Sequence, residues 1–193
     1  MKISILLPYK ENYSVEYAGA VSIFVNGVNK FSKFNKSIKV YGNTDYSNKL
    51  SKNYVNIPFK KKYFQSSSKV YVNNFINLEK VRKSDIIEIH NRPSYLKYFS
   101  YFKKKIVLYF HNDPLSMNGS ISIKERNFIL NTCCKIIFNS EWTKNRFFKD
   151  LDKFYLNSEK IEIIYQSTSK KKINLLKKEK IITFVGKLNK SKG

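Results

Sequence analysis

The stretch KIVLYFHNDP, residues 105–114, decides the fold class. It opens with an apolar run from Ile106 to Phe110 and then changes to histidine, asparagine, aspartate and proline. A short, almost continuous apolar run of this kind is typical of a strand that is buried on both faces of a parallel sheet. The polar residues and the proline that follow mark the point where this strand ends and a loop begins.

The stretch EIHNRP, residues 88–93, has the same ending, so the chain's only two histidines stand at the ends of two predicted strands. Ligands of an open parallel sheet bind at the carboxyl ends of its strands, and we therefore expect His90 and His111 to face one cleft. A histidine there can hydrogen-bond sugar hydroxyls or act as an acid or base. The alternative is that each His-Asn pair caps its strand and orders a turn before proline. The polar neighbours are further candidates for substrate binding: Asn91, Arg92, Asn112 and Asp113.

Strand-like and helix-like segments alternate on both sides of this stretch. Strands are predicted at 2–8, 38–42, 54–59, 85–90, 105–111, 135–140 and 160–166. Helices are predicted at 17–34, 66–84, 93–102, 122–134 and 141–150, with Ser140 as the N-cap of the last. This alternation predicts a parallel sheet covered on both faces. We therefore predict an α/β fold, a Rossmann-like doubly wound parallel sheet, over residues 1–165.

The composition excludes a disordered chain, because 42% of the 193 residues are hydrophobic and 16% are aromatic. The formal net charge of +23 invites a nucleic-acid function. Only four of the 37 basic residues are arginine, however, and arginine is the preferred residue for base edges and bidentate phosphate contacts. We therefore predict no nucleic-acid partner. The charge favours anionic substrates and peripheral contact with an anionic membrane.

The apolar runs are too short to span a bilayer, which takes about 18 residues, and the N-terminal run is too short for a signal peptide. We predict a cytoplasmic protein, with peripheral contact at the inner face of the cell membrane. Cys133 and Cys134 are adjacent, and two ligands do not make a zinc site, so both are expected on the inward side of a core helix. The sequence has no glycine-rich dinucleotide or P-loop motif and no cluster of metal ligands, so we predict no metal and no cofactor.

Two further features could bind an anion. Gly19 stands between two alanines at a predicted helix start, where backbone amides can approach an anion; a simple packing role is the alternative. Residues 166–180 are polar and lysine-rich and are predicted to be a linker. After one more strand-like run, Lys187 and Lys192 stand five residues apart and could hold one diphosphate. A solvated lysine-rich tail is the alternative.

Taken together, these segments resemble the N-terminal half of a family 4 glycosyltransferase of the GT-B fold. The resemblance is strongest at 109–148, at KIEIIYQST (160–168) and at FVGKLNKSKG (184–193), which is similar to the family's hxGRLxxxKG motif. It implies retaining sugar transfer from a nucleotide-sugar to a saccharide or lipid-linked acceptor, without a metal, in cell-surface polysaccharide or lipopolysaccharide synthesis. It also implies that residues 1–165 are the acceptor-side domain and that residues 181–193 begin the nucleotide-sugar domain. Such a fragment would be inactive by itself.

The resemblance assigns roles to individual residues. His111 matches the family's histidine after the middle strand and is expected to contact the transferred sugar. Lys187 and Lys192 match the basic pair that holds the donor diphosphate, although Lys187 replaces an arginine and so loses the bidentate contact. Gly19 is the retained second glycine of the family's Gly-Gly loop, and it would let the amides approach the diphosphate.

Two other functions remain open on the sequence alone. One is a basic Rossmann-like module that binds nucleic acid or another polyanion, with an affinity that falls steeply with salt and is indifferent to His111. The other is half of a nucleotide-sugar epimerase, which product analysis would separate from a transferase.

Overall fold

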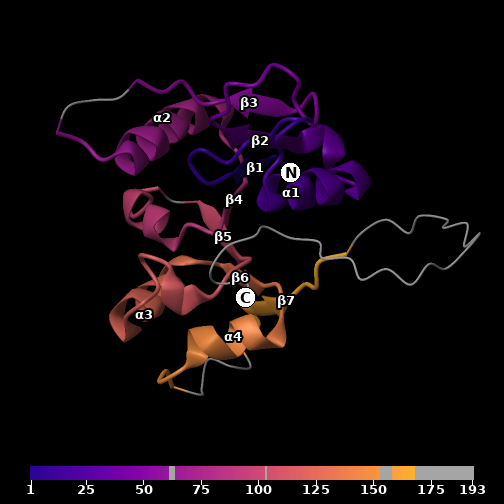
Figure 1. The fold of residues 1–193 in the computed structure, drawn as a ribbon. Helices are drawn as coiled ribbons and strands as arrows, with labels where there is room; N and C mark the ends of the chain where they lie inside the picture. Colours follow the sequence, from indigo (N-terminus) through magenta and orange to yellow (C-terminus); the bar gives the residue numbers. More distant parts are fainter. Residues whose placement is uncertain (61–63, 103, 153–157, 168–193) are drawn as a thin grey trace, which may run out of the picture.

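A computed structural model describes residues 1–60, 64–102, 104–152 and 158–167 (Figure 1). Their strands form one seven-stranded sheet in the order β3-β2-β1-β4-β5-β6-β7, and every neighbouring pair is parallel. This confirms the predicted α/β fold with a doubly wound parallel sheet. The strands are β1 (Ile3–Leu6), β2 (Ile38–Gly42), β3 (Tyr54–Asn56), β4 (Ile86–His90), β5 (Lys105–Phe110), β6 (Lys135–Phe138) and β7 (Ile161–Ile163).

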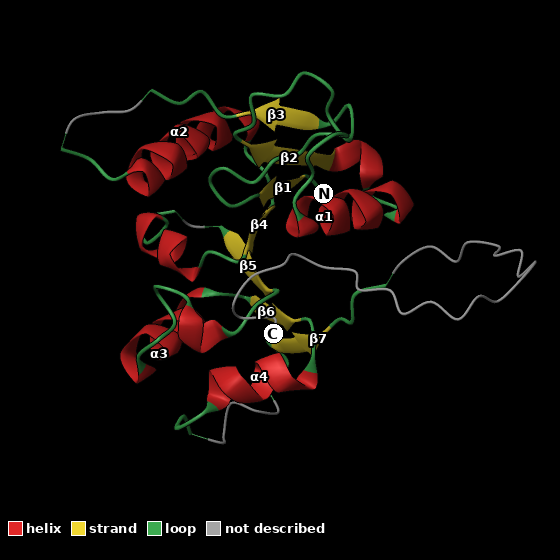
Figure 2. Cartoon of the chain, viewed as in Figure 1, coloured by secondary structure: helices red, strands yellow, loops and turns green. Residues whose placement is uncertain are grey.

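Helices connect the strands (Figure 2). The α-helices are α1 (Ala20–Phe31), α2 (Ser67–Arg82), α3 (Ile123–Thr132) and α4 (Glu141–Phe148), and the 3₁₀ helices are η1 (Asn35–Ser37), η2 (Pro93–Tyr98) and η3 (Pro114–Ser116). Ser140 caps α4 as predicted, because its hydroxyl accepts a hydrogen bond from the backbone N–H of Thr143.

Two of the sequence predictions differ from the structure in detail. The segment 93–102 contains a 3₁₀ helix rather than an α-helix. The three-residue turn of a 3₁₀ helix places Pro93, Leu96 and Phe99 in line, and all three are buried, as is Tyr95. Cys134 is exposed rather than inward, whereas Cys133 is buried. Because α3 ends at Thr132, neither cysteine belongs to the helix: Cys133 is extended, and Cys134 lies in a bend before β6.

The core lies on both faces of the sheet, and Figure 1 shows α1 on one side with α2 and α3 on the other. The smaller cluster packs Val21 and Val25 of α1 against Ile5 of β1 and Val40 of β2. The larger cluster joins α2, η2, α3 and α4 to the opposite face. No helix in the described part of the chain is long and apolar enough to cross a membrane.

All four arginines bond to their own chain. Arg82 donates to the hydroxyl of Ser4 and to two backbone carbonyls, and Arg126 donates to the carbonyls at the end of α4. Arg146 pairs with Asp113, and Arg92 donates to the carbonyl of the residue before it. These guanidinium groups therefore fasten helices and loops to the sheet.

Candidate active site

The direction in which the chain adds strands to the sheet reverses between β1 and β4. The chain leaves β1 toward β2 on one side, whereas β4 leads to β5 on the other side. The loops diverge at this point, and the carboxyl ends of the strands there form the usual ligand-binding crevice of a doubly wound sheet. His90 is the last residue of β4, and His111 directly follows β5.

The structure brings the two histidines together at this crevice. Nδ1 of His90 lies 2.8 Å from Nε2 of His111. The contact extends in both directions, since Nε2 of His90 lies 2.6 Å from a carboxylate oxygen of Glu88, and the side-chain amide nitrogen of Gln166 lies 2.7 Å from Nδ1 of His111. Four side chains thus form one line: Glu88, His90, His111 and Gln166.

The carboxylate of Glu88 sets the direction of this chain of hydrogen bonds. A carboxylate only accepts, so the proton between Glu88 and His90 is assigned to Nε2 of His90. Nδ1 of His90 is then an acceptor, and the next proton belongs to Nε2 of His111. His111 is left with a free lone pair on Nδ1, which here accepts from the amide of Gln166. The outer end of the chain therefore offers an acceptor to a hydroxyl group.

His111 is neutral at physiological pH. Its burial, and secondarily the adjacent His90 ring, lower the pKa of His111 from 6.5 to about 3. A group with so low a pKa is a poor general base near neutrality, because it holds abstracted protons weakly. Of the two roles considered for this histidine, hydrogen bonding to a hydroxyl fits the geometry better.

Aromatic rings hold the imidazoles in place. The ring of Tyr109 stacks on that of His111 at 4.3 Å between centroids, and Phe24 of α1 meets His111 edge-on at 5.1 Å. The Tyr109 hydroxyl donates to the carbonyl of Ile164, just after β7. The site is therefore built from β4, β5, α1 and the segment after β7.

Asn91 supports the backbone of His111. It has a positive φ of 54°, a conformation in which asparagine is tolerated better than most residues. Its side-chain oxygen accepts hydrogen bonds from the backbone N–H groups of His111 and Asn112. The carbonyl of His111 accepts from the side-chain amide of Asn139, at the end of β6. Asn91 was predicted to bind substrate, and the structure gives its side-chain oxygen a positioning role.

The remaining polar neighbours lie around this centre. The carboxylate of Asp113 accepts hydrogen bonds from Nε and Nη2 of Arg146 of α4, which lowers the pKa of Asp113. Asp113 also caps η3, because it accepts from the N–H of Leu115. Arg92 donates to the carbonyl of Asn91, and Asn112 is exposed. Asp113 thus joins the loop after β5 to α4.

Gly19 stands at the N-terminus of α1, where the helix dipole favours an anion. That place is taken by the carboxylate of Glu11, which accepts a hydrogen bond from the N–H of Ser22. A Cβ atom at Gly19 would overlap this carboxylate. The glycine therefore permits the close approach of an anion, and the anion in this structure is a side chain of the same chain.

Four residues of this region were absent from the sequence-based prediction. Asn139 had a detectable signal, because it ends a strand at the same edge of the sheet as the two histidines. Glu88 had one too, because it stands two residues before His90 in a predicted strand and so lies on the same face. Glu11 and Gln166 had none, since their roles depend on contacts between segments far apart in the sequence. Lys187 and Lys192 lie outside the described residues. Within the described residues, no group of three or more His, Cys, Asp or Glu side chains is placed to hold a metal ion.

Comparisons with known proteins identify structural neighbours only. No protein-family model matches the sequence, and no curated protein does. Anabaena Alr3699/HepE, solved in complex with UDP and in complex with UDP-glucose, aligns in both cases with a TM-score of 0.58 and 12% identity, over 87% of this chain and 44% of that one. UDP-N-acetylglucosamine 2-epimerase from Rickettsia bellii aligns with a TM-score of 0.51 and 10% identity, over 86% of this chain and 45% of that one. The chain thus spans less than half the length of these structures, and at such identities the likeness establishes the fold, a Rossmann-like doubly wound α/β sheet.

Proposed function

We propose that this chain forms the acceptor-side wall of a nucleotide-sugar-dependent glycosyltransferase. The observation that supports this most strongly is the neutral His111, held at the switch point of the sheet by Glu88 and His90 with Nδ1 facing outward, where a hydroxyl can replace the amide of Gln166 as donor. Structural neighbours of the same fold have been solved with UDP and UDP-glucose, which agrees with a nucleotide-sugar as co-substrate.

The residues suggest how the chain would act on a sugar. A hydroxyl of the transferred sugar would displace the Gln166 amide and donate to Nδ1 of His111. The donor diphosphate would replace the Glu11 carboxylate at the N-terminus of α1, where Gly19 leaves room for it. Lys187 and Lys192 would hold the same diphosphate and stabilise the charge that develops on the leaving group, in place of a metal.

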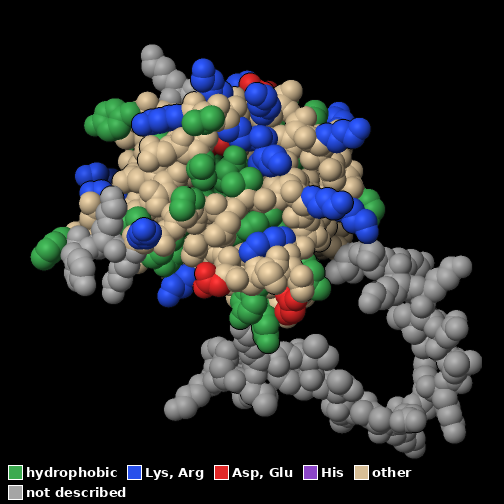
Figure 3. Space-filling model, turned by 90° about the horizontal axis from the view of Figure 1, so that it is seen from above, with side chains coloured by type: hydrophobic (Ala, Val, Ile, Leu, Met, Phe, Trp, Pro, Cys, Tyr) green, Lys and Arg blue, Asp and Glu red, His purple; other side chains and the backbone are tan. Residues whose placement is uncertain are grey.

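The acceptor and the setting of the reaction belong to the same proposal. A retaining transfer to a saccharide or lipid-linked acceptor, on the cytoplasmic side of a membrane, would suit the net charge of +23. Lysine and arginine side chains are scattered over the face seen in Figure 3 rather than gathered in one stripe, so contact with anionic lipid would be peripheral. The second wall of the cleft would come from a nucleotide-sugar domain that begins at residues 181–193.

The test uses a longer form of the protein that includes this second domain. His111→Ala should lower turnover of the nucleotide-sugar by about tenfold or more, since it removes one positioned hydrogen bond. Lys192→Ala should weaken nucleotide-sugar binding measured by calorimetry, whereas Lys190→Ala in the same segment should not. Unchanged turnover in His111→Ala together with unchanged binding in Lys192→Ala would reject the assignment.

An epimerase is the second candidate, and the likeness to the Rickettsia bellii enzyme favours it. Product analysis distinguishes the two functions. A transferase releases a nucleoside diphosphate and forms a glycoside in proportion to added acceptor. An epimerase changes the sugar in the absence of any acceptor. A polyanion-binding module is less consistent with the structure, because all four arginines are bonded within the chain.

A further inference from the structure

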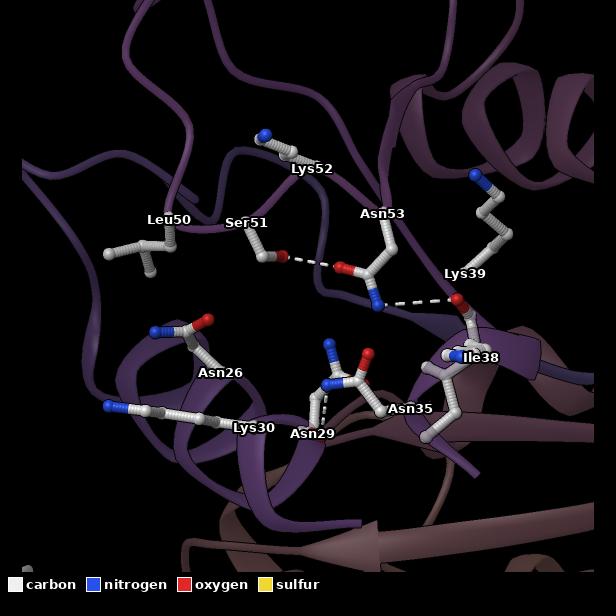
Figure 4. Close-up of a pocket in the computed structure, with 11 residues that line it drawn as sticks. Asn26, Asn29, Lys30, Asn35, Ile38, Lys39, Leu50, Ser51, Lys52 and Asn53 are labelled. Carbon is white, nitrogen blue, oxygen red and sulfur yellow. Dashed lines mark hydrogen bonds between the residues drawn. The ribbon is translucent and has the colours of Figure 1, made fainter. Parts of the chain in front are cut away.

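A polar cavity lies at the opposite edge of the sheet from the two histidines. It has a volume of about 490 Å³, within the usual range for small-molecule sites. Its walls come from the second half of α1, from η1, from the start of β2 and from residues 50–53 before β3 (Figure 4). Because these are the amino ends of β2 and β3, we call it the amino-edge pocket.

The amino-edge pocket is strongly cationic. Four lysines line it, and no carboxylate is among its lining residues. None of the four ammonium groups forms an ion pair with a carboxylate in the described ranges, unlike Lys135 and Lys144 elsewhere on the surface. Like charges gathered around one cavity raise the local concentration of anions. The lysines are Lys30, Lys36, Lys39 and Lys52.

A buried amide lacks a partner at the base of this pocket. Asn29 is only 2% exposed, and its side-chain oxygen has no hydrogen-bond partner among the described residues. Figure 4 shows the Asn29 side chain between Asn26 and Asn35, on the side of the pocket opposite Ser51 and Asn53. Buried acceptors in native proteins are nearly always paired, so this oxygen calls for a hydrogen-bond donor such as a hydroxyl.

Other amides hold the walls in fixed positions. The side-chain nitrogen of Asn35 donates to the carbonyl of Asn29 at 2.9 Å, and that of Asn53 donates to the carbonyl of Ile38 at 3.2 Å. Ser51 bonds to the hydroxyl of Tyr13 at 2.8 Å. A pocket whose walls are already fixed loses little conformational freedom when a ligand binds.

We propose that the amino-edge pocket binds a phosphorylated polyol. The phosphate would lie among the four lysines, and a hydroxyl of the same molecule would donate to the unpaired oxygen of Asn29. Two sources have this chemistry: a free sugar phosphate, and the phosphoglycerol headgroup of an anionic lipid. The site is separate from the crevice at the carboxyl ends of the strands, and the inference does not depend on the proposed transferase activity.

The test measures the affinity of the chain for glucose 6-phosphate, glucose and inorganic phosphate by calorimetry. Glucose 6-phosphate should bind best, and it should shift the side-chain amide signal of Asn29 in a ¹⁵N NMR spectrum. The double variant Lys30→Gln, Lys39→Gln should weaken its binding by about tenfold or more, as expected for the loss of two charge-assisted contacts. The double variant Lys69→Gln, Lys124→Gln removes the same charge from exposed positions elsewhere and should bind like the wild type.

A second variant tests the role of the amide. Asn29→Leu, with folding checked by thermal denaturation, should bind inorganic phosphate normally and lose the preference for glucose 6-phosphate. If Asn29→Leu does not fold, the lysine variants still decide the question. Equal weakening in the two lysine double variants would overturn the proposal, and so would inorganic phosphate binding as tightly as glucose 6-phosphate.

Vesicles of phosphatidylcholine with and without phosphatidylglycerol separate the two sources of ligand. A lipid headgroup is the ligand if three results are found together. The chain binds only the vesicles with phosphatidylglycerol, the double variant of Lys30 and Lys39 abolishes this binding, and free glucose 6-phosphate binds weakly. If glucose 6-phosphate binds and the vesicles do not, the ligand is a soluble sugar phosphate. Binding of neither probe would overturn the proposal.

Discussion

At the scale of single residues, the candidate site depends on the proton positions of two imidazoles. Glu88 accepts from His90, and His90 accepts from His111, so the lone pair on Nδ1 of His111 faces outward. If the imidazole ring of His111 could flip or change tautomer freely, it would present an N–H at this outward position part of the time. In the proposed function, Glu88 and His90 would therefore be positioning residues, which act on a ligand only through His111.

Replacing Glu88 by glutamine tests this arrangement. A glutamine can donate as well as accept, so His90 and His111 should both populate two tautomers in Glu88→Gln. The ¹⁵N chemical shifts of the two rings report the tautomers directly. Glu162→Gln is the matched control, because Glu162 is half exposed and pairs with the side chain of Lys135, away from the two histidines. A single, unchanged tautomer of His111 in Glu88→Gln would contradict the assignment.

The lowered pKa of His111 makes a second residue-scale prediction. The unfolded chain binds a proton at His111 below about pH 6.5, whereas the folded chain does so only below about pH 3. Between these values the unfolded state holds more protons, so acidification destabilises the fold. His111→Gln should therefore reduce the fall in unfolding free energy by about 1 kcal/mol per pH unit between about pH 4 and 6, measured by urea denaturation. Equal slopes for wild type and His111→Gln would show that the pKa of His111 is not lowered.

At the scale of elements, the N-terminus of α1 is occupied by the carboxylate of Glu11 beside Gly19. The backbone of Gly19 has φ −75°, so alanine fits its conformation, and only the carboxylate opposes a side chain there. The effect of Gly19→Ala should thus depend on Glu11. The energetic coupling between positions 19 and 11 therefore tests whether the N-terminus of α1 binds an anion.

A double-mutant cycle measures that coupling. Gly19→Ala should destabilise the wild-type chain by about 1 kcal/mol, through displacement of the carboxylate from the helix N-terminus. In a Glu11→Ala background the same change should cost measurably less, because only the preference for glycine over alanine as an N-cap remains. Urea denaturation of the four proteins provides the comparison. Additive effects would mean that the carboxylate does not hold this position.

The elements also show what the sequence could and could not predict. Apolar runs that alternate with helical periodicity predicted the parallel sheet, and the matched endings of 88–93 and 109–114 predicted that His90 and His111 would meet. The direction of the hydrogen bonds could not be predicted. Glu88 shares a strand face with His90, but the contact of His90 with His111 depends on the register between β4 and β5, and Gln166 comes from a loop beyond the last strand. The exposure of Cys134 was missed for a local reason, because the sequence has no signal for the end of α3.

At the scale of the whole molecule, two localised sites at the edges of the sheet are distinct from the general attraction of anions by a net charge of +23. The carboxyl edge has the two histidines, and the amino edge has the cationic pocket. The remaining basic side chains are spread over the surface, as Figure 3 shows for one face, and such a surface attracts polyanions without selecting among them.

Binding to duplex DNA at different salt concentrations tests this general charge. The affinity should fall steeply and linearly on a logarithmic scale as salt rises, and only weak binding should remain at physiological salt. His111→Ala should bind DNA like the wild type, since a neutral imidazole adds no charge. Tight binding that persists at physiological salt would favour a polyanion-binding module over a sugar-processing enzyme.

The central claim is that His111 contacts the transferred sugar, and ¹⁵N NMR of the His111 ring in a form of the protein that contains both walls of the cleft tests it most directly. UDP-glucose should shift the Nδ1 signal of His111, because a sugar hydroxyl replaces the amide of Gln166, whereas UDP without a sugar should leave this signal in place. Binding of UDP-glucose with no change at Nδ1, or an equal change with UDP alone, would contradict the account.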